Sequence, residues 1–227
     1  MLPEESKIRK EYEKALAKAE ATPFVATEEV IELYKDVVCG AVLVAEANAN
    51  RIGGPVWQNA GLCRVMLRYG RVLERFSDHG DIADTLSSAA ERMEDSLFDH
   101  PRLKAELVRF IIESLHGLEC REGHDISSTD HFMEQLAMLE RNIALADSGQ
   151  LDRVEQTGHE KYDPVEWTEL YENVIDDASR QALDRLKGHP RGLGFCHAYW
   201  SELGDALAER GVEWRSPALM NPHTLYD

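Results

Sequence analysis

Four arginines at helical spacing form the clearest charge pattern in the sequence: Arg64, Arg68, Arg71 and Arg75. At about 100° of rotation per residue, their side chains fall within roughly 60° of one another on a helix. Guanidinium groups pair with carboxylates and phosphates in a forked geometry. In so acidic a chain, ion pairs with glutamates of a neighbouring helix are the favoured explanation of this arginine stripe. The alternative is a docking site for an acidic peptide or a phosphorylated ligand.

The glycine-rich segment 188–194 is a second candidate for anion binding, because it precedes an expected helix. Backbone N–H groups at a helix start attract anions, and His189 and Arg191 add positive charge there. The segment lacks the Lys-Ser/Thr pair of a phosphate-binding P-loop, and no strand is expected before it. A turn between two helices, in which the glycines relieve backbone strain, is therefore the favoured interpretation.

Carboxylates on two expected helices offer a metal-binding alternative. The first helix carries Glu28, Glu29, Glu32 and Asp36. The second carries Glu166, Glu169, Glu172 and Asp176. Carboxylates at this spacing hold Mg²⁺ in helical pyrophosphohydrolases. Because a solvated helix surface gives the same pattern, we favour no cofactor. The alternative is Mg²⁺ or Mn²⁺ held by Glu29, Glu32, Glu169 and Glu172.

Scattered histidine, cysteine and aspartate residues form another set of possible metal ligands: His100, His116, Cys120, His124, Asp125, and Asp176 or Asp177. His116, Cys120 and His124 are four positions apart. Separately, His124-Asp125, with His100 before it and Asp176 or Asp177 after it, superficially resembles the ligands of an HD-type phosphohydrolase. However, Arg121-Glu122-Gly123 precedes the His124-Asp125 pair, where that family has an apolar helix. We therefore do not expect a metal centre of this kind.

Segment 212–227 is rich in apolar and proline residues: Val212, Trp214, Pro217, Leu219, Met220, Pro222 and Tyr226. Exposed tryptophan, leucine and methionine side chains would promote association. We expect this segment to lie extended across helices of its own chain. Docking into another subunit is the alternative.

The elements that position these residues are predicted to be helices, because apolar residues recur every three to four positions and no stretch alternates with period two. Capping residues such as Asp163, followed by Pro164, mark helix starts, and glycines such as Gly149 and Gly211 mark helix ends. The pattern predicts about eight helices, at 4–21, 27–51, 56–77, 82–98, 101–122, 129–148, 164–187 and 194–210.

These helices predict an all-α protein, an irregular multi-helix bundle with an extended C-terminal tail. Helix 27–51 has too broad an apolar face for a surface helix and is expected at the centre, whereas helix 4–21 is expected on the outside. The polar loop 150–163 is the best candidate boundary. We predict a main bundle over residues 1–150 and a C-terminal helical pair plus tail over 151–227, packed on the first part as one domain.

Composition excludes several classes of protein. The chain has 227 residues, with 42 acidic and 25 basic side chains and a net charge of −17. This charge repels phosphates, so direct nucleic-acid binding is not expected. No apolar run approaches the roughly 18–20 residues of a membrane span. The four cysteines are far apart and have apolar neighbours, which predicts reduced, mostly buried thiols in the cytoplasm.

The favoured function is that of a soluble cytoplasmic protein that binds another protein or associates with itself, because the arginine stripe and segment 212–227 supply contact surfaces. No motif specific to an enzyme class occurs, and whether the protein is an enzyme is left open. One alternative is a metal-dependent phosphohydrolase acting on a nucleotide or phosphoester. The other is an acidic mimic of nucleic acid that binds a basic protein.

Overall fold

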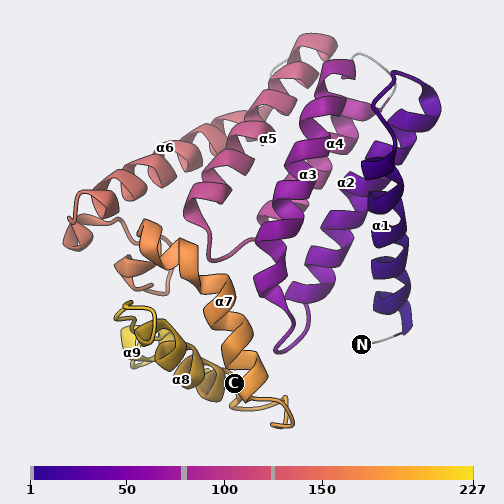
Figure 1. The fold of residues 1–227 in the computed structure, drawn as a ribbon. Coiled ribbons are helices and arrows are strands. Elements are labelled where there is room, and N and C mark those ends of the chain that lie inside the picture. Colours follow the sequence, from indigo (N-terminus) through magenta and orange to yellow (C-terminus); the bar gives the residue numbers. More distant parts are fainter. Residues whose placement is uncertain (1–2, 78–80, 124–125, 227) are drawn as a thin grey trace. The chain divides into compact units, whose positions relative to one another are not determined.

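The computed structural model describes residues 3–77, 81–123 and 126–226. Within these residues the regular elements are all helical and no strand occurs, which confirms the all-α prediction (Figure 1). No described helix combines the length and the apolar character that a membrane crossing requires.

The described residues contain nine α-helices and four short 3-10 helices. The α-helices are α1 (Pro3–Ala21), α2 (Glu28–Ala49), α3 (Asn59–Leu73), α4 (Ile82–Glu94), α5 (Pro101–Glu122), α6 (Ser127–Asp147), α7 (Glu169–Arg185), α8 (Phe195–Ala208) and α9 (Pro217–Met220). The 3-10 helices are η1 (Val56–Gln58), η2 (Glu74–Phe76), η3 (Leu151–Arg153) and η4 (Pro164–Trp167).

The expected helix 164–187 is interrupted at Thr168, whose backbone is extended with φ −78° and ψ 149°. Thr168 Oγ1 donates to the carbonyl oxygen of Val165 at 2.7 Å and accepts from the N–H of Tyr171 at 3.3 Å. The side chain therefore ends η4 and caps α7. Glu166 lies in η4, which corrects the expectation that it shares one continuous helix with Glu169.

Two further expected helices differ at their ends. The range 56–77 divides into η1, α3 and η2, so that Arg75 lies in a 3-10 turn. Helix α4 stops at Glu94, four residues before the expected end, and the chain then makes tighter turns in which Leu97 N–H donates to the carbonyl oxygen of Glu94. Pro101 disfavours helical backbone at the residue before it, so the chain must leave the helix and start again.

Contacts between Cα atoms divide the chain into two compact units. Unit 1 comprises Met1–Asn48, Asn59–Leu97 and Leu103–Leu136. Unit 2 comprises Ala49–Gln58, Phe98–Arg102 and Ala137–Asp227. Unit 2 therefore contains the region 151–227 together with two short earlier segments and the end of α6.

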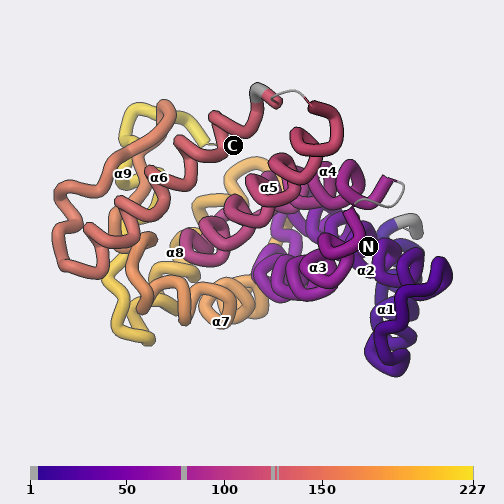
Figure 2. Tube along the Cα trace, turned by 90° about the horizontal axis from the view of Figure 1, so that it is seen from above, coloured from indigo at the N-terminus to yellow at the C-terminus, as the bar shows by residue number. Residues whose placement is uncertain are grey.

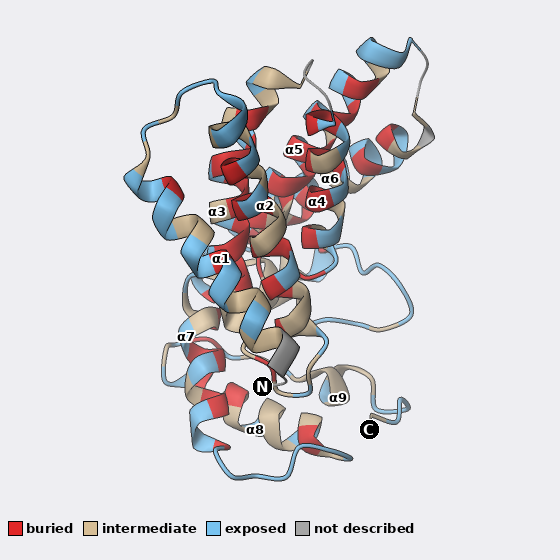
Figure 3. Cartoon of the chain, turned by 90° about the vertical axis from the view of Figure 1, so that its right-hand side faces the viewer, coloured by how far each residue is buried: buried red, intermediate tan, exposed pale blue. Residues whose placement is uncertain are grey.

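In unit 1, α2 has the buried character expected of a central helix, whereas α1 is largely exposed (Figure 3). Tyr12 of α1 is buried and packs against Gly40 of α2, where an added Cβ would lie 3.2 Å from the Tyr12 ring. The absence of a side chain at Gly40 thus allows α1 to approach α2. The buried residues of α2 are Leu33, Tyr34, Val37, Val38, Ala41, Val42, Val44, Ala45 and Asn48.

A buried pair of asparagines connects three segments of unit 1. Asn59 Nδ2 donates to the carbonyl oxygens of Ala45 at 3.1 Å and Ser96 at 2.8 Å. Asn48 Nδ2 donates to Asn59 Oδ1 at 2.9 Å, and Arg9 donates to Asn48 Oδ1 at 3.0 Å. Because each buried amide has partners, this network stabilises the junction without leaving polar groups unsatisfied.

In unit 2, α7 and α8 pack side by side, and a large apolar cluster lies between them. Helix α8 ends at Ala208, and the turn that follows closes at Gly211, the glycine expected to stop this helix, which has φ +81°. There Gly211 N–H donates to the carbonyl oxygen of Ala208, and Val212 N–H donates to that of Leu207. These two hydrogen bonds define a Schellman motif. The cluster contains Tyr171, Ile175, Ala178, Ala182, Leu203, Ala206, Leu207 and Val212.

Candidate functional site

Unit 2 carries an open groove with a volume of about 940 Å³. Its walls come from η3, from segment 163–170, from one face of α8 and from segment 211–219. Two of its leucines remain largely exposed, Leu170 by 50% and Leu219 by 70%. The apolar residues that line the groove are Leu151, Val165, Leu170, Trp200, Ala208, Val212, Trp214 and Leu219.

One face of α8 lines the groove, because the lining residues recur every three or four positions along the helix. They are His197, Trp200, Ser201, Gly204, Asp205 and Ala208. Gly204 and Ala208 are small. A Cβ added at Gly204 would lie 3.9 Å from Cε3 of Trp214, which is ordinary van der Waals contact. The small residues therefore leave room for the Trp214 indole against α8.

Two acidic side chains hold the opposite wall in place, and we call them, with their partners, the carboxylate clamp. Trp214 Nε1 donates to Glu166 Oε1 at 2.7 Å. Arg215 donates to Asp163 Oδ2 through its backbone N–H at 2.7 Å and through Nε at 3.0 Å, and to Oδ1 through Nη2 at 3.2 Å. Asp163 is only 5% exposed, and these bonds provide its buried carboxylate oxygens with donors.

The rest of segment 212–226 packs on its own chain, beside residues 160–166 (Figure 2). The Asn221 amide accepts from Lys161 N–H at 2.8 Å and donates to the Lys161 carbonyl oxygen at 2.9 Å. The rings of Trp200 and Tyr226 meet edge to face with centroids 4.9 Å apart. The segment thus docks on its own chain, as expected, and forms one turn of helix at α9.

Buried acidic groups lie close to the clamp. The pKa of Glu166 is raised to about 8, chiefly by burial and in smaller part by the negative charges of Asp99 and Asp163, although the hydrogen bond from Trp214 acts to lower it. Burial also raises the pKa of Asp99, whose Oδ1 accepts from the Tyr171 hydroxyl at 3.4 Å. Glu166 is therefore largely protonated at neutral pH, unlike an ordinary glutamate.

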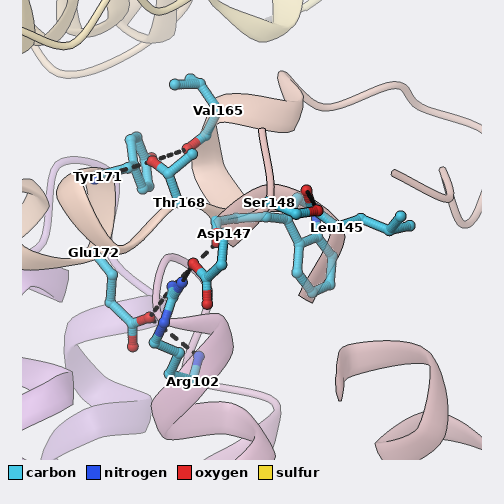
Figure 4. A network of polar contacts seen from close by, with 9 residues as sticks. Arg102, Leu145, Asp147, Ser148, Val165, Thr168, Tyr171 and Glu172 are labelled. Atoms are coloured by element: carbon cyan, nitrogen blue, oxygen red, sulfur yellow. Dashed lines mark hydrogen bonds and ion pairs between the residues drawn. The ribbon is translucent and has the colours of Figure 1, made fainter. Parts of the chain in front are cut away.

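Arg102 contacts several segments of unit 2 through hydrogen bonds and ion pairs (Figure 4). Its guanidinium donates to Glu172 Oε2 at 3.2 Å, to the Trp167 carbonyl oxygen at 3.1 Å and to Asp147. The backbone N–H of Arg102 also donates to Glu172 Oε2 at 3.1 Å. One side chain therefore ties the start of α5 to the end of α6, to η4 and to the first turn of α7.

His100 and Asp176, two of the proposed metal ligands, come together in unit 2. His100 Nε2 lies 3.3 Å from Asp176 Oδ1. Both atoms are buried, and neither has a hydrogen-bond partner in the described part of the chain. Within residues 3–77, 81–123 and 126–226, however, no three histidine, cysteine, aspartate or glutamate side chains are grouped so as to hold a metal ion.

The other proposed metal ligands are dispersed. Glu29 and Glu32 are exposed on α2, and Glu32 pairs with Lys35 at 3.1 Å. Glu169 is exposed on α7, while Glu172 is engaged by Arg102. In α5 the His116 side chain lies 3.9 Å from Glu119, and Cys120 is exposed. His124 and Asp125 lie outside the described residues.

The arginine stripe is exposed, as its spacing predicts, and two of its members have glutamate partners within unit 1. Arg71 pairs with Glu106 of α5 at 3.0 Å, and Arg68 lies 4.0 Å from Glu20 of α1. Arg64 and Arg75 have no ion-pair partner among the residues that the structure describes. The stripe therefore combines the intramolecular pairing that we favoured with two available guanidinium groups.

In the glycine-rich segment, the Arg191 side chain forms hydrogen bonds to the backbone of unit 2. Arg191 Nη1 donates to the carbonyl oxygen of Ile52 at 3.1 Å and to that of Gly53. Gly194 precedes α8 with φ +80°, a left-handed backbone that glycine adopts readily. His189 is exposed. These contacts are those of a turn, and anion binding by His189 and Arg191 stays a prediction.

The four cysteines are all free thiols. Cys63 is buried, and burial raises its pKa to about 12. Cys39 and Cys196 are partly buried, whereas Cys120 is exposed, so the expectation of mostly buried thiols is wrong for Cys120.

Sequence reasoning identified segment 212–227 as a contact surface but missed the groove beside it. The sequence around Leu170 does not indicate that this side chain is exposed, because α7 has apolar residues on more than one side. The pairing of Asp163 with Arg215 joins positions 52 residues apart and has no signal in a single sequence. The excess of apolar residues after Gly211 was the available signal.

Comparison of the chain with models of protein families, with characterised proteins and with solved structures finds no match.

Proposed function

We propose that this protein acts by binding another protein and that the groove of unit 2 is the binding surface. The observation that carries the proposal is the exposure of Leu170 and Leu219 beside two partly buried tryptophans, Trp200 and Trp214, in one groove. Aromatic side chains framed by apolar neighbours are typical of the energetic centre of protein interfaces.

A protein segment fits this groove better than a small molecule. Small-molecule sites reach roughly 300–1,000 Å³ and enclose most of the surface of their ligand. This groove has a volume of about 940 Å³, at the upper end of that range, yet Leu170 and Leu219 remain half or more exposed. An occupant therefore covers the leucines from outside, as a docked peptide segment does.

The proposal is tested by removing the exposed leucines. The tagged protein is used to capture partners from an extract of the cells that make it, and affinity is then measured with each purified partner. We expect the double variant L170A/L219A to bind about 10- to 100-fold more weakly, because two apolar anchors are lost. Helical circular dichroism is expected to stay unchanged because both side chains are largely exposed.

A matched control is available in the same unit. Leu193 and Leu225 are 87% and 97% exposed and do not line the groove. The double variant L193A/L225A is expected to bind normally. Equal loss of affinity in both double variants, or no loss in L170A/L219A, would contradict the proposal.

The arginine stripe is the rival surface, because Arg64 and Arg75 lack ion-pair partners among the described residues. Charge reversal in the variant R64E/R75E distinguishes the two surfaces. Binding through the groove predicts that this variant retains its partner, whereas binding through the stripe predicts that it loses the partner and that L170A/L219A does not.

A further inference from the structure

We infer that the partner segment of this groove carries apolar side chains next to lysine or arginine. The inference rests on the proposed function and names the chemistry of the occupant. Its basis is the distribution of charge along the groove walls, which is independent of the two exposed leucines.

The charged residues that line the groove leave an excess of negative charge. Asp163 and Arg215 are paired with each other and cancel. Asp205 and Glu213 are exposed and have no ion-pair partner in the part of the chain that the structure describes. Among the described lining residues, Arg215 is the single lysine or arginine. Two carboxylates are therefore available to an incoming cation.

The apolar and acidic parts of the lining favour the same kind of side chain. Lysine and arginine lay their aliphatic stems along apolar surface while the charged head reaches a polar group. Their cationic heads also form favourable cation–π contacts with the faces of tryptophan rings. A segment that presents leucine-like anchors and basic residues together can contact the Trp200 and Trp214 side chains and the carboxylates of Asp205 and Glu213.

Net charge disfavours the other occupants. The chain has a charge of −17, so an acidic peptide or a second copy of the same chain approaches against repulsion. A basic segment is instead attracted from a distance, which raises its rate of association. A second copy of this chain is thus a less suitable occupant than a basic segment of another protein.

The test uses two synthetic amphipathic peptides of about 18 residues, roughly five helical turns, with identical leucine positions. One carries lysine and the other glutamate at the remaining positions. Binding to the full chain is measured by fluorescence anisotropy at low and moderate salt. We expect the leucine–lysine peptide to bind at least about 100-fold more tightly than the leucine–glutamate peptide.

Charge-reversal variants show where the attraction originates. We expect D205K/E213K to weaken binding of the leucine–lysine peptide about 10-fold and to reduce its dependence on salt. The control E13K/E134K makes the same change in net charge at two exposed positions of unit 1. It is expected to change affinity by no more than about 2-fold. Equal weakening by both variants would overturn the inference, because general attraction to an acidic protein would then suffice.

The failure of this inference differs from the failure of the proposed function. If the leucine–glutamate peptide binds as well as the leucine–lysine peptide, and L170A/L219A abolishes both, the groove is the binding surface but the partner is not basic. If neither peptide depends on Leu170 and Leu219, the binding function of the groove itself is contradicted.

Discussion

Glu166 and Asp163 belong to the same clamp but are stabilised in different ways. Asp163 accepts three hydrogen bonds from Arg215, two of them from the charged guanidinium, so its ionised form is well compensated. Glu166 accepts a hydrogen bond from the neutral indole of Trp214, and its pKa rises to about 8 mainly because of burial. The Glu166 bond to Trp214 is therefore the pH-sensitive half of the clamp.

The variant E166Q tests this difference. The pKa of Glu166 is about 8 in the folded chain and 4.5 ordinarily, so between these values the native state keeps a proton that the unfolded chain loses. Stability therefore falls as pH rises from 4.5 to 8, and it stays lower above that range. Glutamine keeps an acceptor for Trp214 and cannot ionise. We expect E166Q to exceed the native chain in stability by on the order of 1–3 kcal/mol at pH 9.

The measurement is urea unfolding at several pH values. The two proteins are expected to converge near pH 4, where Glu166 is protonated in both states. A native chain whose stability relative to E166Q does not change between pH 5 and 9 would show that Glu166 is not held in its neutral form.

At the scale of elements, Thr168 decides where α7 begins. Its hydroxyl accepts from the Tyr171 N–H and donates to the carbonyl oxygen of Val165, so one side chain serves both η4 and α7. We expect T168A to lose about 1 kcal/mol of unfolding free energy, a typical cost for removing an N-cap oxygen. T168S retains the hydroxyl and should keep most of that stability in thermal or urea unfolding. Equal losses in both variants would assign the effect to the methyl group.

Most elements could be predicted from the sequence, because apolar spacing, caps and glycines are local signals. Helix α5 coincides with the expected range 101–122, and Gly211 closes the turn that follows α8. The break at Thr168 was missed because Asp163 and Pro164 already formed a strong helix start. In η4 these two residues begin a 3-10 turn instead, with Asp163 accepting from Val165 N–H.

The candidate site was predictable only in part. The sequence indicated that segment 212–227 covers other helices, because its apolar content requires burial. The positions that segment meets, such as Asp163 and Glu166, follow from contacts across about 50 residues of chain, for which composition and spacing carry no information. The exposure of Leu170 likewise depends on which other segments of the folded chain cover it, and a single sequence does not contain that information.

At the scale of the whole molecule, the metal-dependent alternative makes a separate prediction. The described residues contain no group of three potential ligands, and Glu172 is already bound to Arg102. We therefore expect millimolar Mg²⁺ or Mn²⁺ to leave the melting temperature unchanged in differential scanning fluorimetry. A saturable rise with one of these ions, which linkage requires of specific binding to the native state, would contradict this expectation.

The net charge of −17 gives the molecule a general attraction for basic partners, and our proposal locates that attraction in the groove. An acidic mimic of nucleic acid would use carboxylates spread over its surface. The groove uses Asp205 and Glu213 beside an apolar wall. The nucleic-acid mimic and the groove therefore predict that a bound partner slows hydrogen exchange in different segments of the chain.

Hydrogen exchange measured by mass spectrometry, with and without the leucine–lysine peptide, tests the central claim most directly. Binding in the groove predicts slower exchange in segments 163–170, 197–208 and 211–219, with little change in α3. Protection concentrated in α3, or spread evenly over the acidic surfaces of unit 1, would contradict the assignment of the groove as the binding site.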